Sequence, residues 1–362
     1  MVRCFSTGFP DTLADPKTLS KNVLICGYYG EHNLGDDALL AVLLDQLPQG
    51  CRPVVTARDQ QQVRRLFGVQ TTDRSRLAAV LQALAGCDAL VLGGGSLLQD
   101  ATSLRSLIYY AVLMAAARLQ GKPVLLWAQG LGPLRRRRSR ALVRALLPQA
   151  TAISWRDGAS AALARSWGVE ALVGSDPVWS LARRGPWHGA GGPLVLCWRP
   201  VAHLSAAGWA TLLQALAQLA PDRPVLWLPF HQEQDRGLLQ GLEQQALLPE
   251  SLRQRSSQVQ VADPQGALDL FASAGLVLAM RLHGLILAAL AGSPCAALSY
   301  DPKVSAAAAA IGCPDQDLAQ PLQSDQLLQQ WQAALDQPPS PAAIESQIAL
   351  SRCHQQVLLL AP

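Results

Sequence analysis

Short hydrophobic runs alternate with longer segments of mixed polar and hydrophobic residues along most of the chain. Runs of four to eight apolar residues are typical of strands buried on both faces, and the longer segments have the length of helices. The predicted strands are residues 23–26, 89–92, 124–127, 152–155, 194–197, 225–228, 277–279 and 295–298. The predicted helices are residues 36–47, 104–120, 139–147, 206–219 and 284–291.

Strands that alternate with helices predict an α/β fold with parallel sheets and right-handed crossovers. Because 362 residues exceed the size of one ordinary core, we expect two Rossmann-like, doubly wound domains, at residues 22–178 and 193–335. Residues 177–192 are rich in Gly, Pro and Arg and have the composition of a linker. After a second break at residues 338–341, residues 340–360 are predicted to form a helix that packs back on the domains.

Composition narrows the class of protein. Half of the residues are hydrophobic and only 15% are charged, which argues against disorder. The net charge of +4 is mild, and the run Arg135 to Arg138 carries much of it, so we expect no general nucleic-acid-binding surface. That run is interpreted as a solvated helix start, with docking to anionic lipid as the alternative.

The cysteines and the hydrophobic runs bear on the compartment. Eight scattered cysteines without a C-x-x-C spacing indicate free thiols in a reducing compartment, with neither a disulfide framework nor a zinc site. Residues 1–22 lack the apolar core of a signal peptide, and no run reaches the roughly 18 residues of a membrane span. We therefore expect a cytoplasmic protein with, at most, peripheral contact with the inner face of a membrane.

Three glycine-containing turns follow predicted strands of the first half. The first includes Asn33, Gly35 and Asp36, and the third contains Gln129. In the second, Gly93, Gly94 and Gly95 precede Ser96, and three glycines suit the close approach of a ligand to the backbone. Open α/β sheets bind ligands at the carboxyl ends of their strands, so these turns predict a binding crevice. For Asn33 and Asp36, a helix N-cap is an equally good interpretation.

These turns belong to a set of blocks that resembles one family. In the first half the blocks are Gly27 to Gly30, Asn33 to Asp36, Gly93 to Gln99, Gly121 to Pro123 and Gln129 to Pro133. In the second half they are Trp198 to Pro200, Leu228 to His231 with Asp235, Arg281 to Gly284, and Tyr300 to Val304. Together, over about residues 22–314, they are similar to bacterial polysaccharide pyruvyl transferases.

The resemblance implies a glycosyltransferase-B-like fold, with two Rossmann-like domains that face a cleft. It implies transfer of the pyruvyl unit of phosphoenolpyruvate to a sugar of a cell-surface or lipid-linked glycan, which forms a pyruvate ketal. The N-terminal domain would hold the acceptor and the C-terminal domain the phosphoenolpyruvate. The expected partners are this donor and the glycan. No metal or cofactor is expected, and the sequence makes no prediction of oligomeric state.

The residues expected to carry the reaction follow from the matched blocks and from charge. Arg281 follows an apolar run directly, and a planar guanidinium suits phosphate and carboxylate oxygens. His283 is the candidate for proton transfer, His231 for assistance, and Asp36 for positioning or deprotonating the acceptor hydroxyl. The expected substrate-binding residues are Arg281, Leu282, Arg199, Gly284, Lys303, Asn33, Gly35, Gly93, Gly94, Gly95, Ser96 and Gln129.

Other interpretations remain open from the sequence alone. Arg199, His231 and Asp235 are equally consistent with structural salt bridges or a core histidine, and Lys303 with an ordinary surface position. Trp127, Trp155, Trp198 and Trp227 fit either the core or the wall of a cleft. A glycosyltransferase of the same fold that uses a sugar nucleotide is the closest rival function, followed by a non-enzymatic glycan-binding protein.

Overall fold

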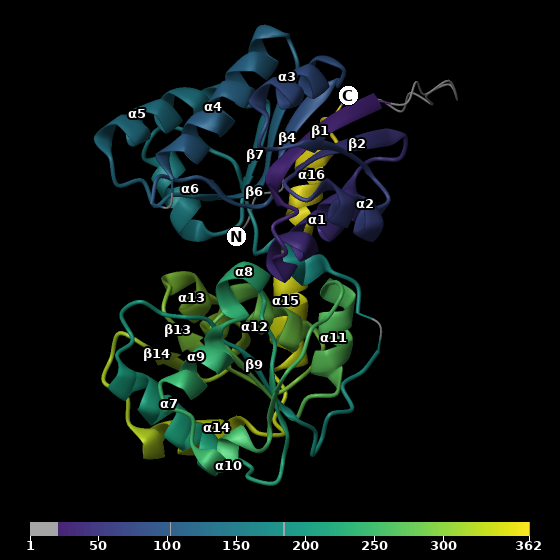
Figure 1. Cartoon of the computed structure of the whole chain (residues 1–362). Helices are drawn as coiled ribbons and strands as arrows, with labels where there is room; N and C mark the ends of the chain where they lie inside the picture. Colours follow the sequence, from purple (N-terminus) through teal and green to yellow (C-terminus); the bar gives the residue numbers. More distant parts are fainter. Residues whose placement is uncertain (1–20, 102, 184, 362) are drawn as a thin grey trace.

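A computed structural model describes residues 21–101, 103–183 and 185–361. The chain forms two α/β domains, which lie one above the other in Figure 1, and its C-terminal helices run from the second domain back to the first. This is the predicted fold class. The parallel strands form two sheets because the hydrophobic runs are buried on both faces, as in residues Val23 to Cys26 and Leu194 to Cys197.

The N-terminal domain contains a parallel sheet whose strands follow the order β3-β2-β1-β4-β6-β7-β8, with β5 beside β6. Its strands are β1 (Lys21–Tyr29), β2 (Cys51–Ala57), β3 (Gln70–Asp73), β4 (Ala89–Leu92), β5 (Gly95–Leu98), β6 (Val124–Leu131), β7 (Ala152–Trp155) and β8 (Leu172–Val173). Its helices are α1 (Leu34–Gln46), α2 (Gln60–Phe67), α3 (Leu77–Ala85), α4 (Leu104–Leu119), α5 (Arg137–Leu146), the short η1 (Leu147–Gln149) and α6 (Gly158–Arg165).

The C-terminal domain contains a second parallel sheet, in the order β11-β10-β9-β12-β13-β14. Its strands are β9 (Leu194–Cys197), β10 (Val225–Trp227), β11 (Ser256–Gln258), β12 (Leu276–Ala279), β13 (Cys295–Ser299) and β14 (Asp315–Asp317). Its helices are α7 (Ala206–Gln218), α8 (Gln232–Asp235), α9 (Leu238–Gln244), α10 (Glu250–Arg253), α11 (Pro264–Ala272), α12 (Leu282–Leu290), α13 (Pro302–Ile311) and α14 (Ser324–Ala334).

Both sheets have the strand order of a doubly wound dinucleotide-binding fold, and each order reverses beside its first strand. The reversal falls between β1 and β4 in the N-terminal domain and between β9 and β12 in the C-terminal domain. The chains leaving two such strands turn to opposite faces of the sheet, and this opens a crevice at their carboxyl ends. The two crevices are the places where the fold predicts ligands.

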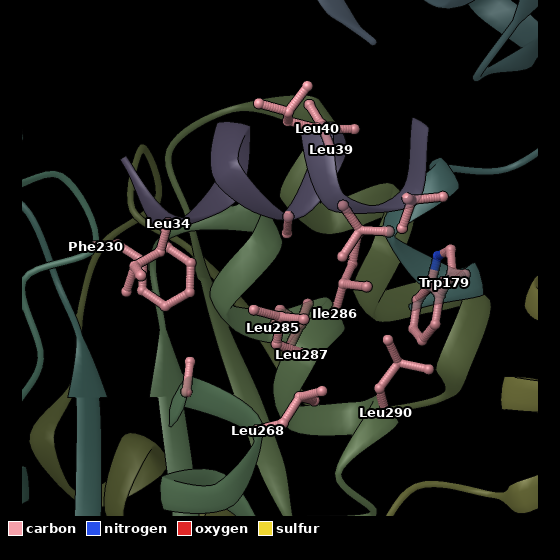
Figure 2. Close-up of a cluster of buried hydrophobic side chains, with 14 of the residues drawn as sticks. Leu34, Leu39, Leu40, Trp179, Phe230, Leu268, Leu285, Ile286, Leu287 and Leu290 are labelled. Atoms are coloured by element: carbon pink, nitrogen blue, oxygen red, sulfur yellow. The ribbon is translucent and has the colours of Figure 1, made fainter. Parts of the chain in front are cut away.

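The domains are joined through a hydrophobic contact that centres on α1. Leu34 of α1 belongs to the same buried cluster as Phe230, Leu285 and Ile286 of the C-terminal domain, and Figure 2 shows these side chains between the helices. The backbones also meet: Leu34 N donates to Phe230 O at 2.9 Å, and Gln232 N donates to His32 O at 3.0 Å. Burial of large apolar side chains on both sides fixes the relative placement of the domains.

The C-terminal segment consists of α15 (Pro341–Ser351), η3 (Arg352–His354) and α16 (Gln355–Leu358). Helix α15 contacts α13 of the second domain, and α16 contacts β6 of the first (Figure 1). The segment expected to be a linker begins with a buried turn, η2 (Pro177–Ser180), in which Val178 and Trp179 pack into the interdomain core. Among the described residues, no helix combines the length and hydropathy that a membrane span needs.

Candidate functional site

The two domains bring the N-terminus of α1 and the N-terminus of α12 together. Asn33, immediately before α1, forms an isolated antiparallel bridge with His231 of the C-terminal domain. The imidazole of His283, in the first turn of α12, packs against Gly35, and a β-carbon at residue 35 would overlap the ring. Gly35 is therefore required by the close approach of His283, and two residues predicted to belong to the site are in direct contact.

His283 also faces a buried carboxylate of the interdomain segment. Its Nε2 lies 3.4 Å from Oδ2 of Asp176, yet it has no well-aligned hydrogen bond within the described ranges. Arg156, at the end of β7, donates from Nη1 to the same Oδ2 at 3.2 Å. Burial alone would raise the pKa of Asp176, but the imidazole of His283 and the guanidinium of Arg156 outweigh it and hold that pKa well below its usual range. Asp176 thus remains ionised and orients the imidazole of His283 and the guanidinium of Arg156.

A second contact across the domains involves Ser96 and Lys303. The Nζ of Lys303, on α13, donates to Oγ of Ser96 at 2.8 Å, and Nη2 of Arg156 donates to the same hydroxyl at 3.3 Å. Burial and the nearby charge of Arg156 lower the pKa of Lys303. Lys303 is therefore not an ordinary surface lysine. Ser96, Arg156 and Lys303 bring two cationic side chains to one hydroxyl at the domain boundary.

Asp36 lies in the first turn of α1, next to this group. Asn33 forms the helix N-cap, because its Oδ1 accepts from Gly35 N at 3.0 Å, and its Nδ2 donates to Oδ2 of Asp36. Burial raises the pKa of Asp36 to about 6, against the opposing influence of His283 and Arg156. A carboxyl group with such a pKa can take up and release a proton near neutral pH, which suits proton transfer.

Arg281 precedes α12 and is held by a buried carboxylate. Its Nε and Nη2 donate to the two carboxylate oxygens of Asp235, at 3.1 and 2.5 Å, and Nη2 also reaches Oε1 of Gln234 at 3.1 Å. The Asp235 side chain is fully buried and also accepts from His231 N. Burial and the charge of Arg281 lower the pKa of His231, so its imidazole is neutral at pH 7. Asp235 thereby fixes Arg281 and the chain at His231 in one arrangement.

Arg199 lies at the end of β9, on the same edge of the second sheet. Its guanidinium carbon stands 4.9 Å from the centre of the Tyr300 ring, and its Nη1 donates to the Tyr300 hydroxyl at 3.0 Å. Arg199 makes no ion pair with the described residues, so its charge is available to a ligand. Stacking on an aromatic ring is a common way to hold an arginine in place without neutralising it.

Leu282 lines a small cavity between the domains, with a volume of about 200 Å³. Its walls include Ile286 and Ala307, and Arg156, Asp176 and Lys303 stand at its polar part. The cavity therefore joins an apolar surface to the cationic group described above. Such a mixture suits a small organic anion with an apolar end.

Several of the glycines expected to bind substrate are positions at which close packing requires glycine. A β-carbon on Gly93 would overlap the Tyr29 hydroxyl, and one on Gly94 would lie 2.9 Å from Leu39 Cδ2. At Gly284 the obstacle is Cys197, whose Cβ would lie 2.9 Å away. Close packing of side chains therefore accounts for glycine at these three positions, and their contact with a substrate stays a prediction. Gly95, with φ of 112° and open space beside it, keeps the predicted turn geometry.

Gln129 is a further correction. Its side chain is completely buried, and Nε2 donates to Leu92 O at 3.1 Å and to Gly93 O. The amide therefore ties β6 to the turn after β4 and has no surface to offer a substrate. The four tryptophans are likewise core residues, since Trp127, Trp155, Trp198 and Trp227 are at most 4% exposed.

Arg156 and Asp176 were not predicted from the sequence. Arg156 follows the hydrophobic strand of residues 152–155 directly, as Arg281 follows its own strand, and this position was the available signal. Asp176 precedes a proline in the segment interpreted as a linker, where no periodicity marks it. No group of three or more His, Cys, Asp or Glu residues within the described ranges is arranged to hold a metal ion.

Two Rossmann-like domains with a charged boundary at their carboxyl edges define a protein of the glycosyltransferase-B-like class. Solved structures agree. Anabaena HepE in complex with UDP and glucose superposes with a TM-score of 0.57 at 14% identity, over 93% of this chain and 95% of that one. The UDP-GlcNAc 2-epimerase of Neisseria meningitidis, bound to UDP-GlcNAc, gives 0.57 at 11%, over 94% and 99%. Acinetobacter baumannii MurG gives 0.50 at 14%, over 94% and 99%. These identities establish the fold alone.

The family is narrower than the fold. The model of the polysaccharide pyruvyl transferase family matches residues 33–302, and the chain belongs to this family. The matched range contains Asp36, Arg156, Asp176 and the segment from Arg281 to His283. Among curated proteins, none matches the chain.

Proposed function

We propose that the protein transfers the pyruvyl unit of phosphoenolpyruvate to two hydroxyls of one sugar in a glycan, which forms a cyclic pyruvate ketal and releases phosphate. Family membership supports a polysaccharide-modifying enzyme. The observation that carries the finer proposal is the meeting of His283 with Gly35 and Asp36 beside Arg281, Arg156 and Lys303. This arrangement combines groups able to exchange protons with cations that suit a small anion.

In the proposed reaction, an acid delivers a proton to the methylene carbon of the enol, and positive character develops at the adjacent carbon. A sugar hydroxyl attacks that carbon and loses its proton to a base. A second hydroxyl of the same sugar then displaces phosphate and also loses a proton. One proton thus ends in the new methyl group, and the phosphate leaves with the electrons of the broken carbon–oxygen bond.

His283 is proposed as the acid. Its Nε2 lies 3.4 Å from the ionised carboxylate of Asp176, which orients the imidazole. Asp36 is proposed as the base for the acceptor hydroxyl, since its pKa of about 6 leaves it mostly ionised at pH 7. His231, neutral and buried with a free Nδ1 among the described residues, is the second candidate for accepting a proton.

The donor's phosphate and carboxylate need fixed cations. Arg281 is held by Asp235, and Arg199 is held by Tyr300, so both are ordered before a ligand arrives. Pre-ordered cations stabilise charge that develops on the leaving phosphate without a cost of reorganisation. Arg156 and Lys303, which converge on Ser96, are proposed to extend this cationic surface toward the N-terminal domain.

The cysteines of the described residues are free thiols, which supports the proposed cytoplasmic setting.

A glycosyltransferase that uses a sugar nucleotide is the rival function, because two of the structural neighbours are complexes with UDP and glucose or with UDP-GlcNAc. Thermal unfolding with phosphoenolpyruvate and with a panel of UDP-sugars separates the two. We expect phosphoenolpyruvate to raise the Tm and the UDP-sugars to leave it unchanged. Stabilisation by a UDP-sugar alone would favour the rival.

A further inference from the structure

A second cavity, of about 440 Å³, lies wholly in the N-terminal domain. Its lining comes from the carboxyl ends of neighbouring strands: Tyr28 is near the end of β1, Arg58 follows β2, and Arg74 follows β3. The first turns of α4 close it with Arg105 and Tyr109. The cavity therefore occupies the edge of the sheet at which α/β folds bind ligands.

A buried carboxylate orders two of its arginines. Glu31, whose side chain is 2% exposed, accepts from Nη1 of Arg58 at 3.0 Å through one oxygen and from Nη2 of Arg74 through the other. Two guanidinium groups therefore share one negative charge inside the cavity wall. Within the described ranges, the only other acidic residue that forms an ion pair with either arginine is Glu233. Its side chain is exposed, and its Oε2 lies 3.7 Å from Nη1 of Arg58. The local charge remains positive.

Arg105, in the first turn of α4, adds a third positive charge to the lining of the cavity. It makes no hydrogen bond or ion pair with the residues that the structure describes. An exposed, unpaired arginine beside two ordered ones favours an anion in the space they share. Arg suits phosphate and carboxylate groups because its donors lie in one plane.

The aromatic residues of the cavity suggest a sugar beside the anion. The Tyr28 ring is 39% exposed and is held in place by Arg74, whose guanidinium carbon lies 4.5 Å from the ring centre. Tyr109 lines the cavity, and its buried hydroxyl has no hydrogen-bond partner among the described residues, so a small shift of the ring would let it donate to a ligand. An amphipathic ring and a free hydroxyl together suit a sugar, whose faces are apolar and whose edges are polar.

We propose that this cavity binds the acceptor glycan through an anionic group, a phosphate or a carboxylate, attached to or next to the sugar that receives the pyruvyl unit. The assignment of the bound sugar as acceptor rests on the proposed function. The cavity is near Asp36, the proposed base, because Arg74 in its wall acts electrostatically on that carboxyl group. An acceptor anchored by its anionic group would place its sugar between the cavity and the domain boundary.

Binding of three matched probes, glucose 1-phosphate, glucuronic acid and glucose, tests the proposal by isothermal titration or ligand-observed NMR. We expect one of the two anions to bind at least about 10-fold more tightly than glucose, and the better of the two identifies phosphate or carboxylate as the group recognised. Arg105→Gln should remove that advantage, because one charge-assisted contact is lost. Arg118→Gln, at the exposed end of the same helix, is the matched control and should bind like the wild type.

Tyr109→Phe supplies a second variant, which breaks no hydrogen bond of the described structure and should leave the Tm unchanged. We expect this substitution to weaken binding of the anionic sugar by about 3- to 10-fold. Equal affinity for all three probes, or equal effects of Arg105→Gln and Arg118→Gln, would overturn the proposal. A loss of phosphoenolpyruvate affinity in Arg105→Gln would assign the cavity to the donor instead. Because these titrations need no turnover, their outcome is distinguishable from a failure of the proposed reaction.

Discussion

The imidazole of His283 packs on the Cα of Gly35, so the N-terminus of α12 in one domain contacts the N-terminus of α1 in the other. Gly35→Ala should displace the His283 side chain from Asp36, because the added β-carbon would overlap its Nδ1 and Cγ and crowd its Cβ. A displacement of about 1 Å in a reacting group can lower kcat by about 10²-fold. Steady-state kinetics checks this, with Gly158→Ala, where a β-carbon meets open space, as the control. Wild-type kcat in Gly35→Ala would contradict the role of this contact.

Replacement of His283 separates chemistry from binding. His283→Gln keeps a hydrogen-bond donor of similar reach but cannot exchange a proton, so kcat should fall by roughly 10²–10⁴ with little change in phosphoenolpyruvate affinity. His188→Gln, at an exposed histidine of the segment between the domains, is the matched control. If His283→Gln loses affinity and keeps its kcat, His283 binds the phosphate, and His231 becomes the candidate for proton transfer.

Substitution of Arg281 should show how much its ion pair with the buried carboxylate of Asp235 contributes to stability. Arg281→Ala leaves Asp235 unpaired in the interior, so the free energy of unfolding should fall by about 3–5 kcal/mol. Arg281→Lys keeps the charge and should preserve the fold better. It should still bind phosphoenolpyruvate roughly 10-fold more weakly or worse, because an ammonium cannot reproduce the planar fork.

Titration calorimetry measures the donor affinity, and chemical denaturation measures the stability. Arg236→Lys, at an exposed arginine next to Asp235 that forms no ion pair with the described residues, is a comparison for the conservative change. Arg281→Lys with undiminished donor affinity would remove Arg281 from the donor site.

The raised pKa of Asp36 predicts a pH dependence of both activity and stability. As the base, Asp36 must be ionised, so kcat/KM should rise as the pH increases through about 6. For stability the sign is opposite: the folded protein holds the proton more tightly than the unfolded chain, so ionisation of Asp36 destabilises the fold as the pH rises from about 4 to 6. Asp36→Asn should therefore gain stability relative to the wild type over that interval. A constant difference between the two proteins from pH 4 to 7 would contradict the raised pKa.

Excess chelator should leave turnover intact, since the described residues contain no cluster suited to a metal ion. A loss of activity that magnesium or manganese restores would favour the sugar-nucleotide rival, in which a cation commonly steadies a leaving diphosphate. Turnover with and without chelator, followed by phosphate release, is the measurement.

The strands that could be predicted are those whose side chains are buried on both faces. Residues 89–92 and 194–197 form continuous apolar runs, and the structure has strands with these bounds. Strands β3 and β11 were missed because they lie at the sheet edges and carry polar sequences, Gln70–Asp73 and Ser256–Gln258. An edge strand is held by backbone pairing with its neighbour, and no local pattern of hydrophobic residues predicts that pairing.

The site residues divide in the same way, into those that a local sequence pattern indicates and those that only tertiary contacts reveal. Arg281 and His283 stand beside an apolar strand and within a recognisable block, so the sequence indicated them. Gly93 and Gln129 belong to equally distinctive turns, but only tertiary contacts reveal that Tyr29 fills the space beside one and that the other is sealed in the core. Asp176 lies in a segment without periodicity, and its role depends on Arg156 and His283 meeting there.

The central claim is that the site at the domain boundary transfers the pyruvyl unit of phosphoenolpyruvate to a glycan. The direct measurement is incubation of the purified protein with phosphoenolpyruvate and a panel of synthetic and lipid-linked glycans, with phosphate release and glycan mass followed together. We expect phosphate to appear in equal amount with a glycan heavier by one ketal-linked pyruvyl unit, and both to appear at least about 10²-fold more slowly with His283→Gln. Glycan gain from a UDP-sugar, with phosphoenolpyruvate left intact across the panel, would contradict the account.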